Sequence, residues 1–393
     1  MDAISTREFY EHYYPYESLV AWLTRHGHAL ERFEFALEGK SASDDKLYKR
    51  YVVARTANEL RAHVVGFTGI RAFHFGGIYP EKCDRRSAPT QRIFSIDIDL
   101  TDYDFLDLTD ADGAVSPAQC DRAYPIAAFA IFVLRHLLGS AFGFQEVLVC
   151  YSGRRGVHLH VTDPTALAMS NEARVAVTAY LTATFTKSGG RISSYTRGVA
   201  KMYELVQPAM DAFERTLVGE MDLFGNGDQI VMFVERLELQ WHDALAALAE
   251  HALAEDDGPG AWAVIKRRVL DAGVGWFKER LLDTVLAYLW PRMDENVSKS
   301  LNHLTKVPFC AHASSRRVAV ALDPATCVTK WSPARAPRLD AWEPPAMAAA
   351  IQNLVAATQK PSVVDVEDAV APAPRPLPRK IGFKRKQSPL VPN

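Results

Sequence analysis

Alternating apolar and polar positions predict short strands in the first part of the chain. Residues 32–37 and 47–53 carry aromatic and β-branched side chains on either side of a polar loop, and they are expected to pair. Residues 72–79 form a further strand candidate with a glycine pair, where a backbone or a ligand can approach closely. Two more apolar runs, residues 93–99 and 147–151, complete the set. The pattern therefore predicts an α/β fold with small sheets.

Helical spacing of apolar residues dominates from residue 171 to about 290. We expect a helical subdomain there, inserted between two halves of a site. A second helix is expected at 124–144, the most apolar run. Because Arg135 and His136 interrupt that run, it falls short of the ~18 apolar residues that a membrane span needs, and a buried helix is expected instead.

The chain is thus divided into four parts by its pattern. Residues 1–170 and 291–340 are expected to form the N-terminal and C-terminal parts of one catalytic domain, with 171–290 as the helical subdomain. Residues 341–393 are rich in Ala and Pro and are expected to be a disordered linker that ends in a basic tail at 379–386. Such a tail is typical of a nuclear-import signal or of a nonspecific phosphate contact.

Composition and charge exclude little. The 393 residues have a formal net charge of −2, so a nucleic-acid binder of this composition must concentrate its cations locally. Five cysteines are scattered and no pair has zinc-site spacing, which favours a reducing compartment with free thiols. No signal peptide and no membrane contact is expected.

Two acids on a predicted strand are the first candidate site residues. Asp97 and Asp99 are two positions apart, so in a strand they project from the same face at about 7 Å from each other. Paired carboxylates in this arrangement are suited to a divalent cation. The run Asp97-x-Asp99-x-Thr101 also fits the nucleophile strand of haloacid-dehalogenase-type phosphotransferases, an alternative that leaves the motifs described next unexplained.

A glycine-framed turn loaded with cations follows the strand at 147–151. Ser152, Arg154 and Arg155 lie between or beside two glycines, and such groups can donate to phosphate oxygens, the arginines in bidentate fashion. His158 then projects from the next strand on the same face as His160. Carboxylates for a cation and a cationic turn for phosphates are the two halves of a phosphoryl or nucleotidyl transfer site.

Charged groups gather a third time near the end of the chain. The segment 291–312 interleaves cations, acids and histidines with apolar residues, which is unusual for a solvated surface. Its candidate residues are Arg292, Asp294, Lys299, Lys306 and His312.

Together these motifs resemble the catalytic small subunit of archaeal and eukaryotic DNA primases, most closely the eukaryotic form. The resemblance covers roughly residues 9–323. It rests on Asp97-x-Asp99 with Thr101-Asp-Tyr-Asp, on the run 152–158, and on Asp294-x-Asn-Val-Ser-Lys followed by Asn302-His, Lys306, Pro308-Phe and His312.

The resemblance implies a primase fold in which two small sheets form a catalytic cleft. It implies that Asp97, Asp99 and Asp294 are catalytic and bind two Mg²⁺ or Mn²⁺ ions. The nucleotide-binding residues that it implies are Arg50, Ser152, Arg154, Arg155, His158, Arg292, Lys299, Lys306 and His312.

The expected function is synthesis of short RNA primers on single-stranded DNA from ribonucleoside triphosphates, without a pre-existing 3′ end. The expected partners are a primase large subunit and the replicative DNA polymerase complex, and the expected location is the nucleus. A primase-polymerase or repair polymerase of the same superfamily, and a noncatalytic subunit that binds DNA or a partner, are the alternatives.

Three departures from the family pattern stand out. Relatives usually carry a four-cysteine zinc site between the two main motifs, whereas residues 105–124 contain only Cys120, so no structural zinc is expected. The family's Arg-Glu-Phe reads Glu31-Arg32-Phe33 here, which displaces or removes one acid. His74 stands where relatives carry an Asp.

Overall fold

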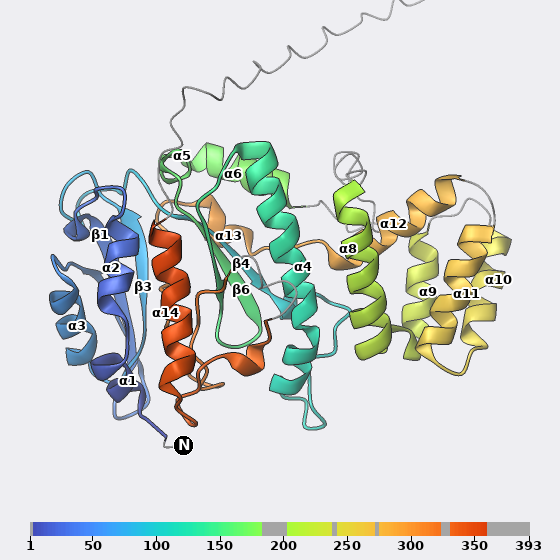
Figure 1. Ribbon diagram of the computed structural model, residues 1–393, viewed down its shortest axis with the longest axis horizontal. Coiled ribbons are helices and arrows are strands. Elements are labelled where there is room, and N and C mark those ends of the chain that lie inside the picture. The colour runs from blue at the N-terminus through green and yellow to red at the C-terminus, as the bar shows by residue number, and fades with distance from the viewer. Residues whose placement is uncertain (1–2, 183–202, 238–241, 272–274, 324–330, 360–393) are drawn as a thin grey trace, which may run out of the picture. The chain divides into compact units, whose positions relative to one another are not determined.

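The described fold contains two small antiparallel sheets (Figure 1). The computed structural model describes residues 3–182, 203–237, 242–271, 275–323 and 331–359. Sheet A has the strand order β2-β1-β3-β7 and sheet B the order β4-β6-β5. The strands are β1 (Phe33–Lys40), β2 (Lys46–Val52), β3 (Ile70–Ile78), β4 (Phe94–Asp99), β5 (Val147–Tyr151), β6 (Gly156–Val161) and β7 (Thr305–Lys306). The expected α/β fold with two small sheets is confirmed.

Helices make up most of the remaining described residues. They are α1 (Thr6–His12), α2 (Tyr16–Thr24), α3 (Ala57–Gly66), α4 (Pro117–Phe142), α5 (Pro164–Leu167), α6 (Asn171–Leu181), α8 (Tyr203–Ala212), α9 (Gly227–Arg236), α10 (His242–Leu253), α11 (Gly258–Asp271), α12 (Gly275–Leu289), α13 (Glu295–Lys299) and α14 (Pro344–Gln359). A π-helical stretch, Phe213–Glu220, follows α8. Residues Met1–Lys360 form one compact unit, and the second unit, Pro361–Asn393 with its basic tail, lies outside the described residues.

Sheet A has one apolar face and one polar face. Phe33, Phe35 and Leu37 of β1 are at most 1% exposed, and helices α1 to α3 cover this side of the sheet (Figure 1). Because side chains alternate along a strand, Glu34 and Glu38 project from the opposite face. The buried face holds the sheet in place, which leaves the polar face of β1 and its neighbours available for a site.

Sheet B is covered by the long helix α4. Among the described residues, α4 is the one helix long and apolar enough to cross a membrane, but more than half of its apolar window is buried inside the fold. Ile126, Ala130 and Leu134 are fully buried, and α4 packs against β4 and β6. The expectation of a buried helix in this apolar run is confirmed.

The segment after residue 340 differs from expectation. We expected a disordered linker from 341 onward, whereas α14 occupies Pro344–Gln359 and buries Met347, Ala350 and Leu354. The prolines stand at the first positions of α14, where a missing N–H costs nothing, and the alanines that follow favour a helix. The linker prediction was therefore wrong for this part of the segment.

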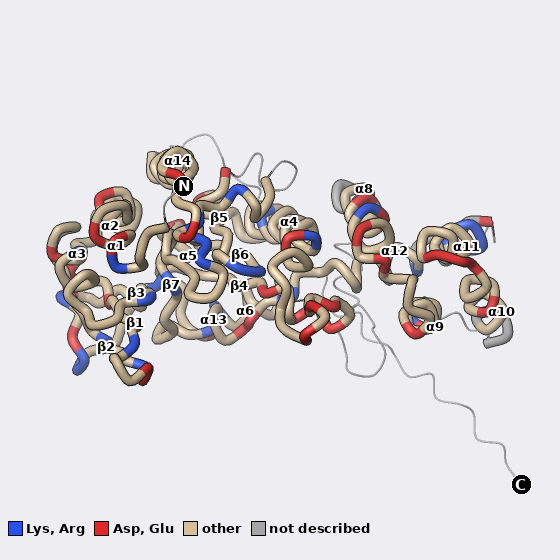
Figure 2. Tube along the Cα trace, turned by 90° about the horizontal axis from the view of Figure 1, so that it is seen from below, with Lys and Arg blue, Asp and Glu red and all other residues tan. Residues whose placement is uncertain are grey.

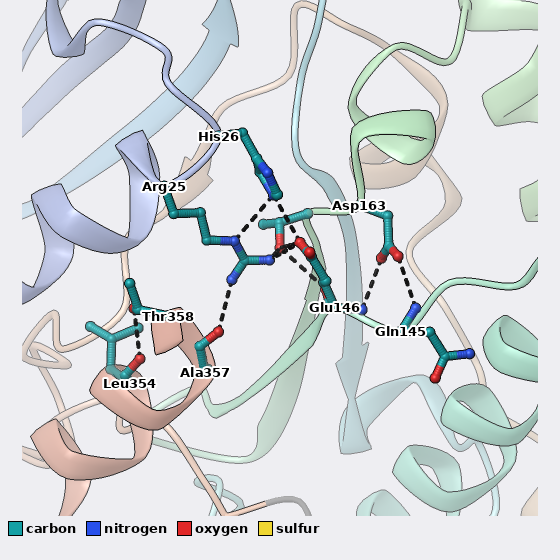
Figure 3. Close-up of polar contacts among 9 residues, drawn as sticks. Arg25, His26, Gln145, Glu146, Asp163, Leu354, Ala357 and Thr358 are labelled. Atoms are coloured by element: carbon teal, nitrogen blue, oxygen red, sulfur yellow. Dashed lines mark hydrogen bonds and ion pairs between the residues drawn. The ribbon is translucent and has the colours of Figure 1, made fainter. Parts of the chain in front are cut away.

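A polar cluster joins α2, sheet B and α14 (Figure 3). Arg25, directly after α2, donates to Glu146 and Thr162, and its Nη1 donates to the carbonyl oxygen of Ala357 in α14 at 3.1 Å. His26 Nε2 lies 2.8 Å from the Glu146 carboxylate. The side chains of Arg25 and Glu146 are only 9% and 13% exposed, so the pair is shielded from water and ties three elements together.

Candidate active site

The paired acids lie on β4, next to the strand that follows the arginine turn. In the antiparallel register of β4 and β6, Asp97 is opposite His158 and Asp99 is opposite Gly156. The His158 Nε2 atom lies 3.4 Å from the Asp97 carboxylate. Both acids project from one face of sheet B, as their spacing predicted.

Asp294 joins them through the backbone. Its N–H donates to the carbonyl oxygen of Asp97 at 3.1 Å, and Met293 forms an isolated antiparallel bridge with Ile98. The Asp294 side chain caps α13 by accepting from the N–H of Asn296 at 3.0 Å. The chain therefore brings the third acid beside the first two, although it is far from them in the sequence.

Electrostatics link the three carboxyl groups. Burial raises the pKa of Asp97 above its ordinary value, and the neighbouring Asp99 and Asp294 raise it further, whereas His158 acts in the opposite direction. The pKa of Asp102 is also raised, first by burial and then by the same three acids. Negative charge is thus concentrated at this end of β4.

The arginine turn is fixed by two glycines. Gly153 has a φ of +91°, a conformation that side chains disfavour, and a Cβ there would lie 3.2 Å from the carbonyl oxygen of Arg317. A Cβ on Gly156 would lie 2.1 Å from the carbonyl oxygen of Ile98 in β4. The Ser152 Oγ accepts from the N–H of Gly156 at 3.0 Å, which closes the turn and leaves the hydroxyl proton available to a ligand.

A cleft with a volume of about 250 Å³ collects most of the predicted site residues. From sheet B and its turn it is lined by Asp97, Asp99, Ser152, Arg154, Arg155 and His158. From sheet A and the final segment it is lined by His74, His303, Lys306 and His312. The cations come from both sides of the cleft, because Arg154 and Arg155 directly precede β6 and Lys306 lies on β7. Figure 2 shows Lys and Arg positions in blue near both strands. Acids and phosphate-binding cations therefore meet in one cavity.

Arg155 contacts an acid directly. Its Nε donates to both carboxylate oxygens of Asp99, at 2.7 and 2.9 Å, and Asp99 also accepts from the N–H and the hydroxyl of Thr101. Arg154 lines the same cleft. The two guanidinium groups consequently lie within the site and not on its outer surface.

The histidines of the cleft are uncharged at neutral pH. Burial lowers the pKa of His158, with Asp97 opposing the effect. Burial, together with the charges of Lys306 and the two turn arginines, lowers the pKa of His312 to about 4. These imidazoles can donate an N–H to a phosphate without carrying charge, so the positive charge of the site comes from Arg154, Arg155 and Lys306.

Three predicted residues lie outside the cleft lining. Arg292 donates to the carbonyl oxygen of Asp102 and to the Asp104 carboxylate at 2.9 and 2.7 Å, and its guanidinium lies over the Tyr103 and Phe105 rings. Lys299 forms an ion pair with Glu295 in α13. Arg50 forms a two-point ion pair with Glu34, at 2.7 and 3.1 Å. Their contact with a nucleotide stays a prediction.

Glu34 was missed by reasoning from the sequence. It is 1% exposed, on the polar face of β1, and its carboxylate is the partner of Arg50. Arg32, two positions earlier, donates its Nε to the carbonyl oxygen of Tyr79 at 2.6 Å. An acid is thus present on this strand, two positions after the place where the expected acid is replaced by Arg32. An isolated Glu between two Phe residues was the available signal.

Arg92 was also missed. It is fully buried, and its guanidinium donates to the carbonyl oxygens of Val297 and Ser300 at 2.8 and 3.1 Å and to the Thr305 hydroxyl at 2.6 Å. Burial lowers its pKa to about 9. Arg92 therefore fixes the segment between α13, which Asp294 caps, and β7, which carries Lys306.

Carboxylates converging on one end of a strand, beside a guanidinium-lined turn, define a nucleotidyl or phosphoryl transfer enzyme. Comparison with known proteins narrows this class. A family model described as "DNA primase small subunit" matches residues 96–324, more than half of the chain. The chain therefore belongs to the DNA primase small subunit family, whose members are nucleotidyltransferases, and the resemblance seen in the sequence is confirmed.

Individual relatives agree with this assignment. The chain is 25% identical to the DNA primase small subunit of Schizosaccharomyces pombe, over 82% of this chain and 73% of that protein. It is 28% identical to the DNA primase small subunit of Caenorhabditis elegans, over 84% of both chains. The Drosophila melanogaster protein of the same name is 26% identical, over 84% of this chain and 78% of that protein.

Divalent metal use is general in this family, and the donor atoms of the site fit it. Within the described residues, no three His, Cys, Asp or Glu side chains are arranged, as they stand, to hold a metal ion. Asp99 is engaged by Arg155, and Asp294 caps α13. All three candidate ligands nevertheless offer the hard oxygen atoms that Mg²⁺ and Mn²⁺ prefer. A bound cation would favour the charged form of Asp97, whose pKa is raised first by burial and then by Asp99 and Asp294.

Proposed function

We propose that the chain joins ribonucleotides into short RNA primers on single-stranded DNA, starting from two free nucleoside triphosphates. The observation that carries this proposal is the convergence of Asp97, Asp99 and Asp294 beside the turn that carries Arg154 and Arg155. Membership in the DNA primase small subunit family supports it.

Asp97, Asp99 and Asp294 would hold two Mg²⁺ or Mn²⁺ ions. When bound, such ions lower the pKa of an attacking 3′-hydroxyl and neutralise charge on the leaving pyrophosphate. The carboxylates of this chain fix where the reacting phosphate lies relative to the arginine turn. Since the Asp294 N–H is bonded to the Asp97 carbonyl oxygen, that position is set by the backbone.

The cations of the cleft have a complementary role. Arg154, Arg155 and Lys306 neutralise the charge of a triphosphate and the additional charge that develops on its oxygens in the transition state. His158, His312 and the Ser152 hydroxyl donate neutral hydrogen bonds to the same oxygens. To bind a phosphate, Arg155 must release Asp99. Binding of the triphosphate to Arg155 and binding of a metal ion to Asp99 are therefore coupled.

Partners and location follow as further parts of the proposal. The relatives are named small subunits, which implies a larger companion, and we expect this chain to act with a primase large subunit and with the replicative DNA polymerase complex. The basic residues at 379–386 support a nuclear location.

The proposal is tested by de novo dinucleotide synthesis on single-stranded DNA, with and without a large subunit. Wild-type protein with Mg²⁺ or Mn²⁺ and ribonucleoside triphosphates is expected to yield template-dependent dinucleotides, and the Asp97→Asn variant is expected to yield none. Product formed only from a supplied primer and deoxynucleotides would instead identify a repair polymerase. Template binding without synthesis under any condition would identify a noncatalytic subunit.

A further inference from the structure

An exposed tyrosine stands directly outside the catalytic cleft. Tyr48 on β2 is 46% exposed, although it is a large aromatic residue. Its ring centroid lies 6.1 Å from that of His74, which lines the cleft. The Lys46 ammonium lies 5.8 Å from the centre of the Tyr48 ring. The polar face of sheet A thus carries an aromatic surface that continues the cleft wall outward.

Folding does not explain this exposure. The apolar face of sheet A is already filled by residues such as Phe35 and Phe73, which are fully buried. Among the large apolar side chains that are exposed in the described residues, one other is aromatic, Tyr13, and its ring rests on Trp342 at 4.9 Å between centroids. Tyr48 therefore offers a ring face that the packing of the chain does not use.

The His74 ring, which lies between Tyr48 and the cleft, is uncharged. Burial is the main cause that lowers the pKa of His74 to about 4, and Lys306, its neighbour in the β3–β7 pairing, adds to the effect. On its other side, the His74 Nε2 atom lies 3.8 Å from the Glu38 carboxylate of β1. Two neutral or weakly polar rings, His74 and Tyr48, consequently follow one another from the cleft to the surface.

Charge divides the site into two ends. The triphosphate end is cationic, with the guanidinium groups of Arg154 and Arg155 in the cleft lining. His74, which also lines the cleft, leads to Tyr48, where a ring face replaces the guanidinium groups. A nucleotide has the same division, because its phosphates are anionic and its base presents a flat, polarizable face that stacks on aromatic rings.

We propose that Tyr48, with His74 beside it, is a stacking platform for the nucleoside part of a nucleotide whose phosphates occupy the cleft. This inference rests on the proposed function and adds to it a contact for the base and ribose. The nucleoside belongs to the incoming triphosphate or to the 3′ end of the growing strand, since both present the same chemistry. Lys46 over the ring adds a cation for a neighbouring phosphate.

The test compares Tyr48→Ala, Tyr48→Phe and Tyr13→Ala in primer extension on single-stranded DNA. Loss of one base–aromatic stack corresponds to roughly 5- to 150-fold in affinity. Tyr48→Ala is expected to raise by this factor either the KM for the ribonucleoside triphosphate or the KM for the primer strand, and whichever of the two rises identifies the source of the nucleoside. Tyr48→Phe, which keeps the ring, and Tyr13→Ala are expected to stay within about twofold of wild type.

Inorganic tripolyphosphate provides the control, because it has the phosphates without a nucleoside. Its inhibition constant is expected to be the same for wild type and Tyr48→Ala. Unchanged KM values for both substrates in Tyr48→Ala would overturn the inference. Parallel weakening of tripolyphosphate would do so as well, since it would show that Tyr48 only supports the shape of the cleft.

A binding measurement separates this inference from the proposed function. Titration of a fluorescent ribonucleoside triphosphate in the presence of Ca²⁺ reports binding without requiring synthesis. If the protein makes no primers but Tyr48→Ala binds the ribonucleoside triphosphate more weakly than wild type, the stacking platform is supported and the proposed polymerase activity is rejected. If wild type and Tyr48→Ala are equally active and bind the nucleotide equally well, the polymerase is retained and the stacking platform is rejected.

Discussion

The backbone N–H of Asp294 donates to the carbonyl oxygen of Asp97 at 3.1 Å, which joins two parts of the chain that are far apart in the sequence. Main-chain pairing therefore helps to hold the third carboxylate beside the first two. We expect Asp294→Asn, which keeps a capping oxygen but removes the charge, to lower dinucleotide synthesis at least about 100-fold. The melting temperature is expected to stay near that of wild type, because asparagine also caps helices well.

Asp112→Asn is the matched control for this prediction, since it makes the same charge change on an exposed loop. Its rate is expected to equal that of wild type. Full activity in Asp294→Asn would show that the acid has no part in the reaction.

Gly156 sets the spacing between β4 and β6. A Cβ at this position would lie 2.1 Å from the Ile98 carbonyl oxygen, so Gly156→Ala must push the strands apart. We expect a loss of about 1–3 kcal/mol in the free energy of unfolding, together with a fall in synthesis. In contrast, Gly66→Ala at the end of α3 meets no atom within 4 Å and is expected to be neutral or stabilising. Chemical denaturation of both variants checks the prediction.

Arg92 positions the segment that carries Asp294 and Lys306 without touching the cleft. The Arg92 guanidinium donates to two carbonyl oxygens and a hydroxyl at the same time, which the single ammonium group of lysine cannot do. Arg92→Lys is therefore expected to loosen α13 and β7. The expected result is a higher Mg²⁺ concentration for half-maximal synthesis and a lower kcat, with little change in the KM for nucleotide.

Arg174→Lys is the control for that variant, because Arg174 is equally buried but donates to carbonyl oxygens around α5 and to that of Arg92. It is expected to lower the melting temperature without changing the metal requirement. Identical metal requirements in both variants would reduce Arg92 to a purely structural residue.

Stability is expected to fall with decreasing pH because of His160. This side chain is fully buried, and its Nδ1 lies 3.0 Å from the Ser95 hydroxyl. Burial holds its pKa well below 6.5, so the unfolded chain binds a proton that the folded chain does not. Between pH 6.5 and the lowered pKa, this residue contributes a loss of about 1.4 kcal/mol for each unit of decreasing pH.

The measurement is urea denaturation of wild type and His160→Gln at pH 7.5, 6 and 5. The variant is expected to be less stable overall but to show a shallower dependence on pH. His63→Gln, at an exposed position of α3, is expected to keep the wild-type slope. Parallel curves for wild type and His160→Gln would contradict the assignment.

The Arg25–Glu146 cluster in Figure 3 is expected to affect stability and not activity. Arg25→Ala leaves the shielded Glu146 carboxylate without its guanidinium partner, which is expected to cost about 3–5 kcal/mol. Arg338→Ala removes a pair with Asp340 in which both side chains are more than 40% exposed, and it is expected to cost about 0–1 kcal/mol. Thermal unfolding of the two variants distinguishes the cases, and equal costs would mean that water reaches Glu146.

Much of the site was predictable because its signals are local. The two-residue spacing of Asp97 and Asp99 placed both on one face, and the glycines around Arg154 and Arg155 indicated a turn. Long-range pairing was not predictable in this way. No local pattern shows that Asp294 meets the backbone of Asp97.

Other features depended on partners that the sequence does not reveal. The nucleotide contact of Arg292 stays a prediction, but the contacts of its guanidinium with Asp104 and two aromatic rings were not foreseen. The segment after residue 340 was taken for a linker because of its composition, but α14 packs against α2 and β5, elements from much earlier in the chain. In each case tertiary packing decided the outcome.

The close approach at Gly156 also bears on how far the sequence can drift. The distance from the carboxylate strand to the arginine turn is imposed by the close contact of two backbones, so the apolar side chains of these strands can vary as long as the order of apolar and polar positions is kept. Gly156, because it has no side chain, sets the distance between the carboxylates and the arginine turn.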